Sequence, residues 1–149
     1  MGVSPGPKAL ANRPLPTHCL RGLARRKWVE DNQVLQDAFM PDERTAQDRA
    51  DGGAETSIDW EDDSDVEAKA SRRSNAAFGL ARLGVSDIEY VNRGVNTIKA
   101  LLAERSPKPD NPHHGDLVFR AGMPIKQTRA IANLLGLMSQ YVPPSRGGP

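Results

Sequence analysis

The sequence predicts a mostly α-helical protein: a small C-terminal three-helix domain with one short extended segment, preceded by a largely disordered N-terminal half. The distribution of apolar residues is the first observation behind this prediction. Leu, Ile, Val and Phe number 11 in the first 75 positions and 19 in the last 74. A packed core has to offset about 1–2 kcal/mol of backbone entropy per ordered residue, and only the second half carries enough apolar side chain for that.

Charge is the second observation, because it divides the chain into blocks of opposite sign. Residues 1–29 hold six Lys or Arg and no acid, residues 30–68 hold fourteen Asp or Glu against two Arg, and residues 69–149 hold twelve basic residues against five acidic ones. Low hydrophobicity with a large local charge is typical of a segment that stays solvated. We also expect the blocks to attract one another, so that the acidic segment competes with outside ligands for the basic surface.

The first half divides into three predicted parts. Residues 1–27 are basic and rich in Pro and Gly, which indicates a flexible arm. Apolar residues at helical spacing predict a short amphipathic helix at 28–40, which is too short to be stable in water by itself. Residues 41–64 are acidic and show no sustained periodicity, so they are expected to form a disordered linker.

Residues 65–142 are predicted to form the helical domain. A possible capping pattern at 64–67 would start a first helix that ends before Gly84, a residue type that often terminates helices. A clearer capping box at 86–89 is followed at once by apolar residues at helical spacing. This pattern predicts a second helix over 87–104.

The end of the chain supplies the extended segment and the third helix. Residues 116–120 are expected to be extended and to pair within the chain or across a homodimer. Pro124 suits the first turn of a helix at 124–140, in which Gly136 would allow close packing between helices, within the monomer or across a dimer. Residues 143–149 are predicted to be a tail.

The segment 80–86 has the pattern of a helix-turn-helix element that reads DNA. Its surroundings are basic, as phosphate binding requires. The same pattern fits an ordinary helical hairpin with Gly84 and Ser86 as caps, and Asp87 and Glu89 oppose contact with DNA. We therefore predict a small non-enzymatic regulatory or accessory protein that binds a polyanion, with nucleic acid ahead of an acidic protein. The predicted nucleic-acid contacts are Arg72, Arg73, Arg82, Asn92, Arg93, Asn96 and Lys99.

A protein–protein adaptor is the alternative function. In that interpretation the helical domain docks on a partner, and linear motifs at 28–40 and Trp60 add separate contacts. Trp60 stands among acids in the predicted linker, and isolated aromatic anchors of this kind often bind partner proteins. The 28–40 helix could equally dock on the chain's own domain. The predicted partner contacts are Trp28, Leu35, Phe39 and Trp60.

Enzymatic chemistry finds little support in the sequence. Cys19 is the sole cysteine, so no internal disulfide can form, and a nucleophile on a flexible arm lacks a fixed base. His113 and His114 are adjacent and point in different directions, whereas a catalytic zinc needs three protein ligands. No phosphate-binding glycine loop is present. The sequence therefore predicts no enzyme, no metal site and no cofactor.

Targeting patterns are weak. No apolar run approaches the ~20 residues that a membrane span needs, and the N-terminus has no continuous apolar stretch of the secretory type. Its basic, acid-free character is typical of mitochondrial transit peptides, but four prolines between Pro5 and Pro16 oppose a long amphipathic helix. The expected location is cytoplasmic or nuclear, and neither secreted nor transmembrane; whether the arm is a cleaved targeting peptide stays open.

Overall fold

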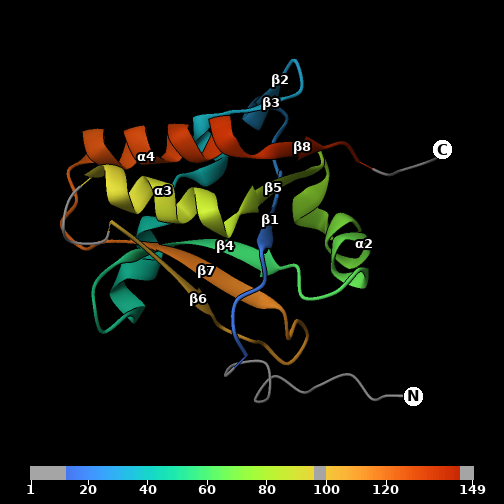
Figure 1. The fold of residues 1–149 in the computed structure, drawn as a ribbon, viewed down its shortest axis with the longest axis horizontal. Helices are drawn as coiled ribbons and strands as arrows, with labels where there is room; N and C mark the ends of the chain where they lie inside the picture. Colours follow the sequence, from blue (N-terminus) through green and yellow to red (C-terminus); the bar gives the residue numbers. More distant parts are fainter. Residues whose placement is uncertain (1–12, 96–99, 145–149) are drawn as a thin grey trace.

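The computed structural model describes residues 13–95 and 100–144, and it has a mixed α/β fold rather than three helices. An antiparallel sheet has the strand order β6-β7-β4-β1-β5-β8 (Figure 1). The prediction of a mostly α protein with a disordered first half is wrong, because two of the four interior strands, β4 and β1, come from that half. The strands of this sheet are β1 (His18–Gly22), β4 (Ala54–Trp60), β5 (Leu80–Gly84), β6 (Leu101–Arg105), β7 (His114–Phe119) and β8 (Gln140–Val142).

Helices and a small hairpin surround this sheet. The α-helices are α2 (Asp65–Ser71), α3 (Val85–Val95) and α4 (Ile125–Met138). Short 3-10 helices are η1 (Arg26–Trp28), η2 (Gln36–Phe39), η3 (Glu43–Asp48) and η4 (Ser74–Ala76). The hairpin consists of β2 (Val29–Glu30) and β3 (Gln33–Val34).

The two faces of the sheet are covered differently. Successive residues of a strand point to opposite faces. On one side, which we call the helix face, the sheet packs against α3, α4 and η2, and the larger core lies there; Figure 1 shows α3 and α4 side by side. On the opposite side, which we call the outer face, a smaller cluster packs Leu20 and Leu80 against α2 and η4. Elsewhere the outer face carries polar side chains such as Glu55 and Asp116 beside the apolar Leu102 and Val118.

Strand β4 explains why residues 41–64 are not the predicted disordered linker. Its side chains alternate, with four buried on the helix face and three between them on the outer face. This period of two is the signal of a strand, but the acids and hydroxyls on the outer face conceal it in the composition. The buried residues are Ala54, Thr56, Ile58 and Trp60, and those between them are Glu55, Ser57 and Asp59.

The predicted helix at 28–40 is also wrong. Val29 pairs with Val34 and Glu30 with Gln33, so a two-residue turn separates the strands of the hairpin. Both turn residues, Asp31 and Asn32, have positive φ angles of 51° and 64°. Asp and Asn adopt this left-handed conformation more readily than other residues with side chains, and two such residues in succession make the tight turn that suits twisted strands.

The second half contains both corrections and confirmations. The first predicted helix is interrupted: α2 ends at Ser71, and residues 80–84 form strand β5. The helix-turn-helix interpretation is therefore wrong, because its first helix is a strand. The second predicted helix is divided between α3 and strand β6. The third helix and the extended segment at 116–120 are confirmed as α4 and β7, with bounds shifted by one or two residues.

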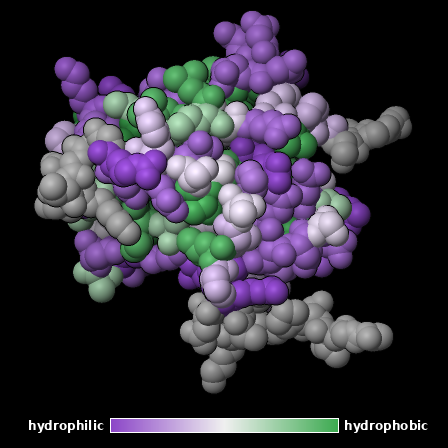
Figure 2. Space-filling view, in the orientation of Figure 1, coloured by the Kyte–Doolittle hydropathy of each residue, from purple (hydrophilic) through white to green (hydrophobic). Residues whose placement is uncertain are grey.

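The surface of the described residues is mainly hydrophilic, with single apolar side chains exposed (Figure 2). None of the helices in the described parts of the chain is long and apolar enough to cross a membrane. Figure 2 shows one face of the molecule, on which apolar areas are scattered among hydrophilic ones. The large apolar side chains that are exposed are Leu15, Tyr90, Leu102, Ile125, Leu134 and Leu137.

Trp60 packs against Gly115 on the helix face of the sheet. Trp60 is fully buried, and its ring Nε1 donates a hydrogen bond to the Glu104 carbonyl oxygen at 3.0 Å. A Cβ atom on Gly115 would overlap Nε1 of Trp60 and lie 2.7 Å from the same carbonyl oxygen. Only glycine leaves room for the indole, so this position fixes how β4, β7 and β6 pack.

We expect Gly115→Ala to lower the free energy of unfolding by about 3 kcal/mol or more, because the added methyl group meets a buried ring and backbone rather than a flexible side chain. Urea unfolding measures this. Gly122→Ala is the matched control: nothing lies within 4 Å of its added Cβ, and only its φ of +75° opposes the side chain. The control should cost about 1–2 kcal/mol. Equal losses in the two variants would show that the Trp60 contact is not limiting.

Cys19 provides a second test of the fold. It lies on β1, fully buried on the helix face, and burial raises the pKa of its thiol, with the carboxylates of Asp59 and Glu61 adding to the effect. The thiolate is the reactive species, so the native protein should not react with Ellman's reagent at pH 8. One thiol per chain should react after denaturation, since the chain has one cysteine. Rapid labelling of native protein would contradict the position of β1 in the core.

Candidate functional site

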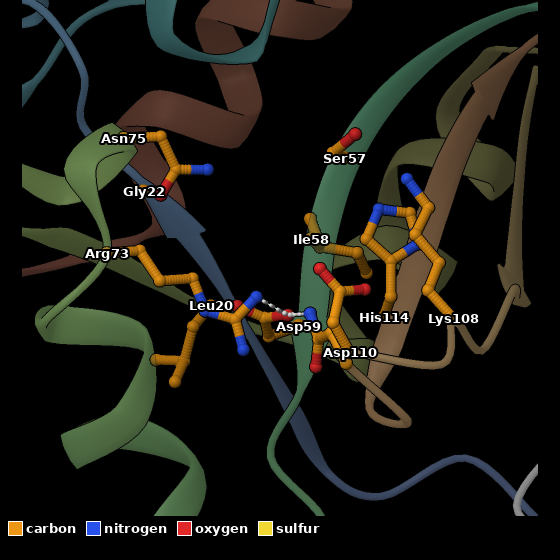
Figure 3. Close-up of a pocket in the computed structure, with 11 residues that line it drawn as sticks. Leu20, Gly22, Ser57, Ile58, Asp59, Arg73, Asn75, Lys108, Asp110 and His114 are labelled. Carbon is orange, nitrogen blue, oxygen red and sulfur yellow. Dashed lines mark hydrogen bonds and ion pairs between the residues drawn. The ribbon is translucent and has the colours of Figure 1, made fainter. Parts of the chain in front are cut away.

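The candidate functional site is a polar groove on the outer face. It lies between α2 with η4 on one side and the segment 107–113 on the other. Two adjoining cavities of about 230 and 280 Å³ form it, and both are lined by Arg73, Asp110 and Asn111. Figure 3 shows Arg73 and His114 on opposite sides of the first cavity.

Strand register places the floor of the groove. Asp59 on β4 lies opposite His114 on β7, and Leu20 on β1 lies opposite Asp59. All three side chains therefore project from the outer face, where Leu20 supplies an apolar contact and Ser57 a hydroxyl. The groove thus has a rigid base made by three adjacent strands.

The two walls bring cations to this floor. Arg73 follows α2, and its Nη1 lies 3.8 Å from Asp59 Oδ1. Lys108 stands on a tight turn closed by reciprocal backbone hydrogen bonds of 3.0 Å between Lys108 and Asn111. Asn111 Nδ2 donates to Asp59 Oδ1 at 2.5 Å. The wall is thereby pinned to the floor, and the Asp59 charge is engaged within the fold.

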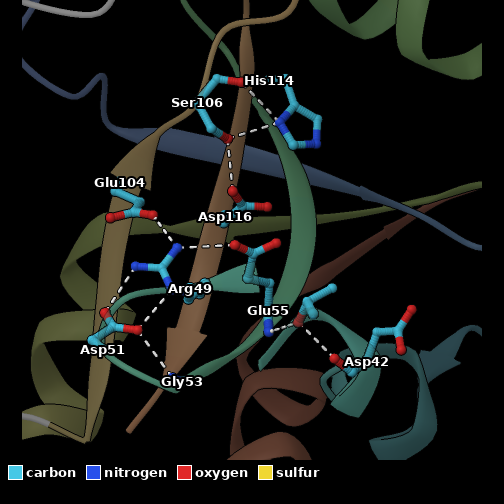
Figure 4. A network of polar contacts seen from close by, with 10 residues as sticks. Asp42, Arg49, Asp51, Gly53, Glu55, Glu104, Ser106, His114 and Asp116 are labelled. Carbon is cyan, nitrogen blue, oxygen red and sulfur yellow. Dashed lines mark hydrogen bonds and ion pairs between the residues drawn. The ribbon is translucent and has the colours of Figure 1, made fainter. Parts of the chain in front are cut away.

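The contacts of its Nδ1 indicate the tautomer of His114. Its Nδ1 lies 3.1 Å from the Ser106 carbonyl oxygen, which can only accept, and 2.8 Å from Ser106 Oγ. Nδ1 therefore carries a hydrogen, and in this tautomer Nε2 is the acceptor nitrogen. Ser106 Oγ in turn donates to Asp116 Oδ2 at 2.7 Å (Figure 4). A chain of hydrogen bonds thus connects the groove to Asp116.

Arg49 organises a second polar cluster beside the groove (Figure 4). Its guanidinium contacts Asp51, Glu55 and Glu104 at 2.5–2.9 Å. These contacts raise the pKa of Arg49 above its already high usual value, and Arg49 together with the Gly53 amide lowers that of Asp51. Thr45 completes the cluster, since its Oγ1 accepts from the Glu55 amide at 2.8 Å. The loop after η3 is thereby held over the outer face.

Asp62 is the centre of a buried ion-pair network. Arg105 donates to both of its carboxylate oxygens, at 2.6 and 3.0 Å, and His113 Nδ1 lies 2.7 Å from Oδ2. The Asp62 and Arg105 side chains are only 2% and 3% exposed. Burial by itself would raise the pKa of the Asp62 carboxyl, but the hydrogen bonds from Arg105 and His113 outweigh it and hold the pKa below its usual range. Arg105 also donates to the carbonyl oxygens of Arg13 and Pro14, which fixes the segment before β1.

No protein family, curated protein or solved structure matches this chain. The groove brings together cations on two walls, a carboxylate that is held by a hydrogen bond, and further hydrogen-bonding groups.

The predicted nucleic-acid contacts are dispersed by the fold. Arg73 lines the groove and the exposed Arg72 adjoins it in sequence. Arg82 pairs with Glu61 at 2.7 Å. Asn92 accepts from the amides of Ala100 and Leu101 and donates to the Leu101 carbonyl, so it joins α3 to β6. Arg93 is exposed on α3, whereas Asn96 and Lys99 lie outside the described residues.

The predicted partner contacts are mostly internal. Phe39 and Trp60 are 0% exposed, and both belong to the core of the helix face. Trp28 is partly buried, and the Arg21 guanidinium lies 5.3 Å from its ring centre. Leu35 is half-buried beside Gly136, where the close approach predicted for this glycine is made by the Val34–Leu35 backbone rather than by a helix. The segment 28–40 and Trp60 are therefore not free linear motifs of the kind that the sequence predicts.

The remaining groove residues were missed from sequence. Asp59, Lys108, Asn111 and His114 come from distant positions, and only the register of β4 with β7 brings them together. His113 and His114 do point in different directions, as predicted: the first contacts Asp62 and the second Ser106. The alternation of β4 is the one signal that could have placed Asp59 on a polar sheet face.

We expect Asp62→Asn to cost about 3–5 kcal/mol of stability at pH 7, because it leaves the buried Arg105 without its counter-charge. The folded-state pKa of Asp62 is lowered, so the wild type keeps this stabilisation above the ordinary Asp pKa of about 4 and loses it as the pH falls below that value. The variant should therefore lose less stability between pH 5 and pH 2. Urea unfolding across this range is the measurement.

Asp48→Asn serves as the control for this experiment. Asp48 is exposed at the end of η3, so its substitution should change stability by no more than about 0.5 kcal/mol. An Asp62→Asn variant that behaves like this control would show that the Arg105 pair contributes nothing.

Proposed function

We propose that this protein is a non-enzymatic binding protein that holds a strand of nucleic acid in the outer-face groove. The observation that carries the proposal is the set of cations around one concave surface. Lys69 and Arg73 stand on the α2 side and Lys108 on the opposite wall. Phosphates supply most of the affinity of nucleic-acid binding, and cations on two walls can neutralise a phosphate backbone lying between them.

The floor of the groove adds hydrogen-bonding groups. Ser57 and the acceptor Nε2 of His114 on the floor, and Asn75 on the η4 wall, suit sugar hydroxyls and base edges, the groups that a single strand exposes. The cavities are too small to admit a double helix, which favours a single strand over a duplex. Asp110 at the rim of the groove is an acid that would repel a phosphate, and it is exposed on the turn.

An acidic segment of a protein partner is the competing ligand, because carboxylates would meet the same cations. The adaptor function is otherwise weakened, since Phe39 and Trp60 are buried. A nucleic-acid-binding role is consistent with a cytoplasmic or nuclear protein, the location that we propose.

The test is fluorescence anisotropy of the full chain with labelled single-stranded RNA and DNA at 50 and 200 mM salt. The full chain is needed because β1 and β4, from the first half, form the floor of the groove. Arg73→Ala and Lys108→Ala should each weaken binding about equally for different sequences. Each should also reduce the slope of log affinity against log salt by about 1, if each contacts one phosphate.

Lys126→Ala and Arg129→Ala are matched controls, because both residues are exposed on α4, the helix that packs on the opposite face. They should leave affinity and salt slope unchanged. Absence of binding at 50 mM salt, or an equal loss in the controls, would refute the proposal. Binding of a poly-glutamate peptide with loss in Arg73→Ala, and no binding of nucleic acid, would establish the acidic partner instead.

A further inference from the structure

We propose that Glu55, Glu104 and Asp116 form a binding site for a divalent cation of the oxygen-preferring kind, with Ca²⁺ as the best fit. One oxygen of each carboxylate lies within 4.8 Å of the other two. Within the described residues this is the cluster of side chains that has the spacing of metal ligands. The inference goes beyond the proposed function and does not depend on it, because none of these three residues lines the groove.

The sheet itself gathers these carboxylates. Glu104 on β6 lies directly opposite Asp116 on β7, and Glu55 on β4 lies opposite Val118, two residues along β7 from Asp116. All three side chains therefore point to the outer face from adjacent strands. Like charges directly opposite each other destabilise a sheet, so this arrangement calls for compensating positive charge.

Arg49 supplies only part of that charge. Its Nη1 contacts Glu55 Oε2 at 2.9 Å and Glu104 Oε1 at 2.5 Å, while its remaining donors contact Asp51. One guanidinium is thus shared among three carboxylates. In the described parts of the chain it makes no hydrogen bond to Asp116, and the second oxygens of Glu55 and Glu104 have no hydrogen-bond donor.

Asp116 gives the independent indication of a ligand. The residue is only 4% exposed, and Ser106 Oγ holds its Oδ2 at 2.7 Å. Its Oδ1 is buried and has no hydrogen-bond partner among the described residues. Buried carboxylate oxygens without a partner are rare because the lost hydration is not replaced. Figure 4 shows the Asp116 carboxylate beside that of Glu55, which is where a cation would meet both.

Coordination chemistry favours Ca²⁺ over Mg²⁺. Ca²⁺ takes six to eight oxygen ligands at about 2.3–2.6 Å in flexible geometry, whereas Mg²⁺ demands a near-ideal octahedron at about 2.0–2.1 Å. Two oxygens on opposite sides of Ca²⁺ are therefore up to about 5 Å apart, which accommodates carboxylates spread over 4.8 Å. Ser106 is a positioning residue, since it orients Asp116 and leaves Oδ1 for the ion.

The experiment measures Ca²⁺ binding by calorimetry and the melting temperature of the full chain in EDTA and in Ca²⁺. Wild type should bind one Ca²⁺ per chain and melt at a higher temperature in Ca²⁺ than in EDTA. Asp116→Asn should fold at least as stably as wild type in EDTA, because it removes a repelling charge, but should lose at least about tenfold in affinity. Ser106→Ala should lose about tenfold, as partners that orient metal ligands commonly do.

Two further variants sharpen the outcome. Asp48→Asn, an exposed acid at the end of η3, is the control and should bind like wild type. Arg49→Gln should melt lower in EDTA and recover more than wild type on addition of Ca²⁺, since the ion takes over the charge of the guanidinium. A melting temperature of wild type and Arg49→Gln that does not respond to Ca²⁺ would overturn the proposal, as would equal Ca²⁺ affinity in wild type and Asp116→Asn.

Discussion

The contact of Trp60 with Gly115 connects three strands at once. The indole lies on the glycine of β7, projects from β4 and donates its one hydrogen bond to the backbone of β6. Because the side chains of a strand alternate, a slip of one residue in this pairing would turn Trp60 outward and Asp59 inward. The register that Trp60 holds on the helix face is therefore the same register that sets Asp59 against His114, and Glu104 against Asp116, on the outer face. Core packing on one side and polar chemistry on the other follow from one constraint.

The opposite charges of the sequence blocks form ion pairs within the folded chain. Acids from the block 30–68 pair with bases from the block 69–149 in three places around the end of β4: Asp59 with Arg73, Glu61 with Arg82, and Asp62 with Arg105. The attraction expected between the blocks is thus present, but as fixed contacts of a folded sheet. The acidic segment cannot act as a detachable brake on the basic surface, because its residues 54–60 are an interior strand. Burial of the Asp62–Arg105 pair costs desolvation, so removal of either partner would leave an uncompensated buried charge.

Elements whose signals are local can be predicted from the sequence. Helix α4 has a long apolar periodicity and a proline at its start, and β7 contains the apolar run 117–119 after a proline-rich loop. Other elements depend on tertiary contacts, and the sequence does not predict them. Strand β4 offers polar residues at every second position, so its average hydropathy resembles that of a linker, and Asp31-Asn32 makes a turn in the middle of an apparent helical repeat. The groove could not be assembled for the same reason: Arg73 was identified as a binding residue, but its companions on the opposite wall are brought to it only by the sheet.

The strand order also has a consequence for how the chain folds during synthesis. β1 and β4 lie next to each other in the sheet, but their outer neighbours, β5 and β7, are made much later. The first half therefore leaves the ribosome before β5 and β7, with which its strands pair, have been synthesised. Non-local pairing of this kind is slow and exposes chains to aggregation. A segment with few apolar residues and a large net charge stays dispersed through such a delay. The low apolar content and high charge of the first half, which are typical of disordered segments, thus suit strands that are synthesised before their pairing partners.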